Sequence, residues 1–554
     1  MNHPTVNQTK ASERSTVTAP KKKLIEVSLP LETINAASVR EKSIRHGHPS
    51  TMHLWWSRKP LATARAFLFA QLVDDPTSRP EDFPTVEEQD AERARLHALM
   101  EQLVVWENSN NSALIARAQA EIRKSNAGEL PAVLDPFAGG GSVPLEAQRL
   151  GLSATGSDLN PVAVLLNKAL IEFPPKFAGQ SPVSPLAATR TTGWERSEGM
   201  AEDVRQYGKW VRDEAERRIG GLYPKVLAPG GTEHTVVAYK WVRTVVNPNP
   251  ANPVRVPLSN SWWLSKKKGK EAYVVPEVRD CSVSYRVSHD ANGPSGMSDG
   301  TVGRAKGGAV SVVDGTPISW SYIRSEGKAG RIGHDMVAVV AEGVRGRLYL
   351  DAKDSDREVA NVARPKGVAD IEIPLGGPAA RNVPLYGMDT FGDLFTPRQL
   401  IAMECLSSLV PEARDAVLQD ALRAGVPRGE RLADGGSGAE AYADAVATYI
   451  GLAVSRQTNR MTSLNTWQNI GDKVAQVFTR QVIPMTWDYA EVNPFSSSSG
   501  NFLSNVDWVA DALAGVPASV EGLGLQEDAS NRDYRNVVVA TDPPYYGLFA
   551  SECG

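Results

Sequence analysis

The chain has 554 residues and a formal net charge of −4, with 42% hydrophobic and 22% charged residues. These values are typical of a globular protein with several domains, and they exclude a mainly disordered or fibrous chain. The sequence shows neither a stretch of about 20 apolar residues nor the apolar core of a signal peptide, so we expect a cytoplasmic protein without a membrane partner.

Metal binding is not predicted by the pattern of potential ligands. Cys281, Cys405 and Cys553 are too few and too far apart for a disulfide framework or a cysteine zinc site. Three histidines cluster over residues 46–53, but no cysteine or carboxylate joins them in a ligand-like spacing. We therefore interpret these histidines as loop or DNA-contact residues and expect no metal.

The N-terminal part begins with a polar tail, residues 1–20, that we expect to be disordered. Residues 21–130 form the next predicted domain, and their first half carries more Lys and Arg than Asp and Glu. Within this domain, residues 55–61 open an apolar helix that continues to Ala70. Hydrophobic packing at a helix start is one explanation for these residues. A DNA-contact function is the alternative for Trp55, Trp56 and Arg58.

A strand, a glycine turn and a helix follow in the predicted domain 131–178. The apolar run 131–134 ends in Asp135, and three successive glycines, Gly139–Gly141, precede a helical pattern. Glycines allow a ligand to approach the backbone closely, and the next helix offers free N–H groups. The following strand ends at Asp158, an acidic residue suited to hydrogen bonding with ribose hydroxyls.

The order of residues in this turn separates it from other nucleotide-binding turns. It lacks both the Gly-x-Gly-x-x-Gly order of dinucleotide enzymes and the Lys-Ser/Thr of a phosphate-binding loop. It resembles the motif by which methyltransferases hold S-adenosylmethionine. The alternative is a plain α/β turn without a ligand. The resemblance implies that the cofactor is bound by Asp135, Phe137, Ala138, Gly139, Gly141 and Asp158.

Residues 179–390 are rich in Pro and Gly and predict a strand-rich insertion. Lys266, Lys267 and Lys268 follow two tryptophans there, and basic residues next to aromatic ones favour nucleic-acid contact. A structural β-subdomain with a solvated lysine run is the other interpretation. Residues 391–530 are predicted to be mainly helical, with helices over 397–425 and 440–482. Thr396 and Pro397 form a cap and first-turn pair.

The last predicted segment, 531–554, carries a catalytic motif. A β-branched strand over 536–540 leads to Asp542, Pro543, Pro544 and Tyr545 at the end where open α/β sheets place ligands. The Asp542 carboxylate and the Pro543 carbonyl form an acceptor pair for both hydrogens of an exocyclic base amine. The prolines stiffen the turn, and Tyr545 offers a flat face for a base extruded from the duplex.

The pattern as a whole resembles large bacterial and archaeal adenine-specific DNA methylases that carry an N-terminal domain of unknown function (DUF1156-type). In such enzymes a Lys-Pro-Leu helix covers the methionine end of the cofactor, which implies cofactor contacts for Lys59 and Pro60. Members occur in restriction-modification and phage-defence settings. The resemblance extends over residues 24–37, 53–60, 134–142, 263–270, 327–333, 386–400, 485–502 and 542–546.

The resemblance implies an α/β fold: a Rossmann-like methyltransferase sheet that binds S-adenosylmethionine, with a long inserted α+β region. The implied activity is N6-adenine methylation of double-stranded DNA. In the family a further catalytic region follows the Asp-Pro-Pro-Tyr motif, whereas eight residues after Asp-Pro-Pro-Tyr-Tyr, Gly547–Gly554, end this chain. We therefore expect missing C-terminal strands, a truncated or split chain, and a complementing methylase fragment or defence-system proteins as partners.

Three alternatives to this activity remain open. N4-cytosine methylation uses the same amine chemistry, and Asp542 at the first motif position only favours adenine. The chain could instead be an inactive DNA-binding or assembly subunit, because we expect it to be truncated. Methylation of RNA or of a protein glutamine is disfavoured by the family resemblance.

Overall fold

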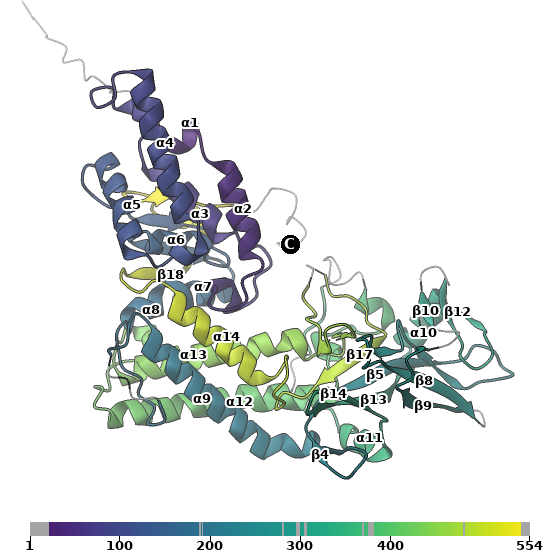
Figure 1. Cartoon of the computed structure of the whole chain (residues 1–554). Coiled ribbons are helices and arrows are strands. Elements are labelled where there is room, and N and C mark those ends of the chain that lie inside the picture. Colours follow the sequence, from purple (N-terminus) through teal and green to yellow (C-terminus); the bar gives the residue numbers. More distant parts are fainter. Residues whose placement is uncertain are drawn as a thin grey trace, which may run out of the picture.

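The structure is a computed structural model with mixed helices and sheets (Figure 1). It describes residues 21–187, 190, 192–279, 282–294, 300–303, 307–367, 370–374, 382–479 and 482–543. The predicted tail 1–20 and two residues of the predicted catalytic motif, Pro544 and Tyr545, lie outside the described residues. No described helix is long and apolar enough to cross a membrane.

A four-stranded parallel sheet forms one part of the molecule. Its order is β18-β2-β1-β19, and the paired residues include Val133 and Val538. Because parallel strands end at the same edge, the residues after β1, β2 and β19 meet there. β19 is shorter than the strand expected over 536–540, since Asn536 has a left-handed φ of 59°. The strands are β1 (Val133–Asp135), β2 (Ala154–Asp158), β18 (Gly522–Gln526) and β19 (Val538–Val539).

Helices from the N-terminal part lie beside this sheet (Figure 1). α3 begins at Leu61 because the Glu41 carboxylate accepts hydrogen bonds from the Leu61 and Ala62 N–H groups, both at 2.8 Å. These bonds fix the start of α3, and Pro60 directly before it has an extended backbone. The helices here are α1 (Leu24–Val27), α2 (Leu31–Glu41), α3 (Leu61–Leu72), α4 (Val86–Leu103), α5 (Ser112–Ser125), α6 (Ser142–Arg149), α7 (Pro161–Asn167) and α8 (Phe173–Lys176).

A buried ionic cluster joins α3 to α6. Glu146 is 0% exposed and accepts from Arg65 Nε at 2.5 Å and from Arg149 Nε at 3.0 Å. Both arginines also donate to Ser109, Arg65 to its hydroxyl and Arg149 to its carbonyl. Burial of two guanidinium groups is costly unless a carboxylate compensates for the charge. Glu146 therefore fixes how the N-terminal helices sit on the sheet.

Long helices pack together across the middle of the molecule (Figure 1). The predicted cap is confirmed: Thr396 accepts from the Gln399 N–H, with Pro397 in the first turn. The predicted helix over 440–482 is wrong beyond Gln457, because Asn465 bonds the backbone of this polar segment and competes with a helix. The helices are α9 (Glu198–Ile219), α12 (Pro397–Arg423), α13 (Ala439–Gln457) and α14 (Phe502–Gly515).

The predicted insertion is strand-rich, and its strand pairs are antiparallel. The central strand β5 pairs with β17, which comes from the later, mainly helical region. The strands are β3 (Val226–Leu227), β4 (Glu233–His234), β5 (Val236–Val246), β6 (Arg255–Leu258), β7 (Trp263–Ser265), β8 (Ala272–Arg279), β9 (Ser282–Ser288), β10 (Val302–Gly303), β11 (Gly308–Val310), β12 (Pro317–Ser319), β13 (Gly333–Gly343), β14 (Gly346–Leu350), β15 (Trp467–Gln468), β16 (Lys473–Val474) and β17 (Asp488–Val492), with helices α10 (Trp320–Lys328) and α11 (Asp354–Ala360).

We expect Glu146→Gln to lower the free energy of unfolding by roughly 3–5 kcal/mol, because two buried guanidinium groups lose their shared counter-ion. Urea unfolding followed by circular dichroism measures this loss. The control is Glu107→Gln, whose partner Arg40 is 56% exposed while Glu107 is 54% exposed, so the unfolding free energy should change far less than with Glu146→Gln. Equal effects of the two substitutions would contradict the structural importance of Glu146.

Candidate active site

The glycine turn connects β1 to α6 at the carboxyl edge of the parallel sheet. Gly139 and Gly141 have φ values of 48° and 75°, a region that other residues rarely adopt. The Gly139 N–H donates to Asp158 Oδ2 at 2.9 Å, and the Asn167 side chain donates to the Gly139 carbonyl at 3.1 Å. The two predicted cofactor elements, the turn and the acidic residue after β2, are therefore in direct contact. Phe137 is exposed beside them.

Trp55 lies directly on the glycine turn. A Cβ added at Gly139 would be 2.8 Å from Trp55 Nε1, and one added at Gly140 would be 3.0 Å from Trp55 Cδ1. The indole of Trp56 stacks on Trp55 with ring centroids 4.0 Å apart, and Trp56 is 56% exposed. The structure therefore places Trp55, expected as a DNA contact, on the cofactor motif.

The turn and the predicted catalytic motif meet although they are far apart in sequence. The Thr541 hydroxyl donates to Asp135 Oδ1 at 2.7 Å across 406 sequence positions. Lys59 Nζ forms an ion pair with the Asp542 carboxylate, and the Lys59 carbonyl accepts from the Ser142 hydroxyl at 2.8 Å. Lys59 thus links the loop before α3 to both motifs. The sequence patterns did not predict a role for Thr541, because its contact with Asp135 depends on the pairing of β1 with β19.

The pKa of the Asp135 carboxyl group is raised in the folded protein. Burial raises its pKa from 3.8 to about 6, and the neighbouring carboxylates of Asp158 and Asp542 add to this elevation. Hydrogen bonds from Thr541 and from the Phe137 N–H oppose it. A carboxyl group with such a pKa is typical of functional sites, although structural networks also produce one.

The predicted lysine run lies elsewhere. Lys266, Lys267 and Lys268 are exposed in the turn between β7 and β8, and β8 is far from the labelled α6 in Figure 1. Lys267 pairs with Asp472 at 2.6 Å, and the Lys266 ammonium lies 5.4 Å from the centre of the Trp263 ring. The structure does not bring these lysines to the glycine turn.

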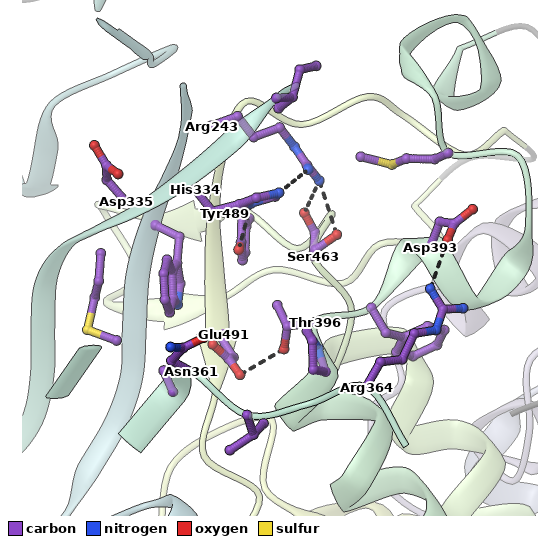
Figure 2. A pocket seen from close by; sticks show the side chains of 18 of the residues that line it. Arg243, His334, Asp335, Asn361, Arg364, Asp393, Thr396, Ser463, Tyr489 and Glu491 are labelled. Atoms are coloured by element: carbon purple, nitrogen blue, oxygen red, sulfur yellow. Dashed lines mark hydrogen bonds and ion pairs between the residues drawn. The ribbon is translucent and has the colours of Figure 1, made fainter. Parts of the chain in front are cut away.

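One cavity adjoins the site, and a second lies away from it. The adjoining cavity, of about 480 Å³, shares Trp55 and Trp56 with the site. The other, of about 660 Å³, lies in the strand-rich part, and Figure 2 shows its polar lining. Arg243 there donates to Ser463, and Arg364 donates to Asp393 at 3.0 Å. Among the described residues, no group of three or more His, Cys, Asp or Glu side chains is placed to hold a metal ion.

One protein-family model matches the N-terminal part of the chain. A family model described as a protein of unknown function (DUF1156) matches residues 28–99, which confirms that part of the expected resemblance. The matched segment includes Trp55, Arg58, Lys59 and the whole of α3. No curated protein and no solved structure matches the chain.

We expect Asp135→Asn to stabilise the protein at pH 8 relative to wild type, and the difference to shrink towards pH 4. The folded-state pKa of Asp135 lies above its unfolded value, so stability falls as the pH rises from about 4 to about 6. The elevation corresponds to about 3 kcal/mol, and Asn can still accept both hydrogen bonds. Thermal unfolding of both proteins at several pH values measures the difference. A difference that does not change with pH would contradict the raised pKa.

Proposed function

We propose that this protein transfers a methyl group from S-adenosylmethionine to the exocyclic amine of adenine in double-stranded DNA. One observation carries the proposal: β1 and β19 are parallel neighbours. Their pairing places the glycine turn and Asp542 at one edge of one sheet, where α/β proteins bind ligands. A cofactor on the turn would thus have its reactive group close to the amine acceptors of the catalytic motif.

The cofactor supplies an electrophilic methyl group when bound, and the chain supplies its binding surface. The Trp55 indole covers Gly139 and Gly140, and Gly141 packs against Asn167 and Leu170, so a cofactor would reach the turn only where the indole moves aside. Asp158 lies at the tip of β2, where ribose hydroxyls can replace or share its bond with the Gly139 N–H. Phe137 offers an exposed aromatic face next to the turn.

The target amine needs acceptors, because its lone pair is delocalised into the ring. The Asp542 carboxylate and the Pro543 carbonyl would each accept a hydrogen bond from one N–H of the amine. These bonds favour a tetrahedral nitrogen that can attack the methyl group. Lys59 fixes the Asp542 carboxylate by its ion pair, and Thr541 anchors the strand end to Asp135. Because the sulfonium of the cofactor activates the methyl group, the amine nitrogen can attack it directly, with the thioether as leaving group, and this positioning holds the amine in line.

We expect Asp542→Ala to reduce methyl transfer at least about 100-fold, because the amine loses its charged acceptor. The measurement is incorporation of radiolabelled methyl groups from S-adenosylmethionine into unmethylated bacterial DNA. Asp533→Ala is the control, since Asp533 is an exposed carboxylate that pairs with Arg535. Digestion of the product to nucleosides separates N6-methyladenine from N4-methylcytosine. Absence of transfer by the wild type would contradict the proposed activity.

We expect Gly139→Ala to weaken S-adenosylmethionine binding at least about tenfold, because a Cβ there meets the Trp55 indole at 2.8 Å. Gly128→Ala is a matched control: Gly128 also has a positive φ, of 88°, but a Cβ there meets nothing within 4 Å. Both substitutions share a backbone cost of about 1–2 kcal/mol. Isothermal titration calorimetry measures the affinities. Equal losses of affinity would mean that the turn does not hold the cofactor.

A further inference from the structure

Three arginines gather next to the cavity of about 480 Å³. Arg58 comes from the loop before α3, Arg456 from the last turn of α13, and Arg460 from the 3-10 turn Thr458–Arg460. Arg456 is only 5% exposed. None of the three forms an ion pair with a carboxylate of the described residues. The cluster is therefore a group of like charges, in which Arg456 is buried and Arg58 and Arg460 are partly exposed.

Several donors in this cluster have no partner. Arg456 Nε and Nη1 and Arg58 Nη1 are buried and form no hydrogen bond within the described chain. The remaining contacts are with neutral groups: Arg58 Nη2 donates to the His53 carbonyl at 3.3 Å, and Arg460 Nη1 donates to the Val474 carbonyl at 2.5 Å. The Arg456 guanidinium carbon also lies 4.3 Å from the centre of the Trp508 ring.

Such an arrangement costs free energy in the unliganded protein. Burial, together with the charges of Arg460 and Arg58, lowers the pKa of Arg456 to about 9. Burial also lowers the pKa of Arg58 to about 10 and that of His53 below its ordinary value. Buried charges in folded proteins are normally paired. A set of buried unpaired donors is instead suited to an anion that arrives as a ligand.

The adjoining cavity adds flat apolar surfaces. Arg456 lines it together with the stacked Trp55 and Trp56 and with Phe478. Trp56 and Phe478 are 56% and 44% exposed, so large aromatic side chains are left accessible here. Aromatic faces beside an arginine-rich groove are the combination by which proteins bind single-stranded nucleotides.

We propose that this cavity holds one nucleotide of a DNA strand, with its phosphate on Arg456, which lines the cavity, and its base against the aromatic side chains. Arg58 and Arg460 add positive charge near Arg456. The inference rests on the proposed function, because that function makes DNA the substrate. It deepens the function by naming where the strand is held next to the catalytic edge, since Trp55 belongs to both places.

The test compares the binding of a fluorescein-labelled single-stranded oligonucleotide to wild type and Arg456→Met by fluorescence anisotropy. We expect at least about tenfold weaker binding and a salt dependence of log K that is flatter by about 0.7, as expected for one lost phosphate contact. Arg217→Met is the control: it removes an equal charge from an exposed arginine that pairs with Glu214, and its affinity should match wild type. An affinity of Arg456→Met within twofold of wild type overturns the proposal.

Thermal unfolding separates a binding role from a structural one. If Arg456 is a ligand-binding residue, Arg456→Met should unfold at the same temperature as wild type or higher, because unpaired buried donors are removed. If its unfolding temperature falls instead, Arg456→Lys decides, because it retains the charge. Recovery of the wild-type salt dependence by Arg456→Lys supports the proposal, and failure to recover it overturns the proposal.

Two further titrations identify the source of the anion. Binding of inorganic phosphate that depends on Arg456, without oligonucleotide binding that depends on it, would overturn the proposal in favour of a free-anion site. Loss of S-adenosylmethionine affinity in Arg456→Met, with oligonucleotide binding intact, would overturn it in favour of the cofactor carboxylate. Oligonucleotide binding that depends on Arg456, in a wild type without methyl transfer, supports the nucleotide site and contradicts only the proposed activity.

Discussion

The shared carboxylate of Glu146 is the contact on which the candidate site depends. It compensates for Arg65 on α3 and Arg149 on α6, so the N-terminal helices and the helix after the glycine turn form one unit. The loop before α3 carries Trp55 and Lys59, and this unit holds that loop over the turn. The segment that matches a family of unknown function is thus an integral wall of the site, not an appended domain.

The site draws its groups from three distant parts of the sequence. The loop before α3 contributes a cation and an indole, β1 and β2 contribute the turn and two carboxylates, and the strand end after β19 contributes Thr541 and Asp542. Parallel pairing brings these parts to one edge, and the long insertion leaves the parallel sheet and forms antiparallel strand pairs that include β17 (Figure 1). The length of that insertion does not disturb the site, because only its ends must be close together.

Local patterns allowed the sequence to predict the glycine turn, the acidic residue after β2 and the cap at Thr396, because each depends on a few neighbouring residues. The contact of Trp55 with Gly139 and the Thr541–Asp135 bond depend on tertiary packing and have no local pattern. Arg58 was among the expected DNA contacts, but Arg456 and Arg460 were missed for the same reason: in the sequence, Arg456 is an ordinary cation in the last turn of a helix. The end of α13 was misjudged because side-chain bonds of Asn465 compete with helical ones.

The position of Trp55 has a thermodynamic consequence. The Trp55 indole covers the glycine turn, and it also lines the neighbouring cavity. A ligand at the glycine turn that moves the indole also changes the shape of the cavity, and a ligand in the cavity that moves it changes the surface at the turn. Linkage then requires reciprocity: if occupancy of the turn changes the affinity of the cavity by some factor, occupancy of the cavity changes the affinity of the turn by the same factor. A single side chain would thereby couple the two proposed binding equilibria.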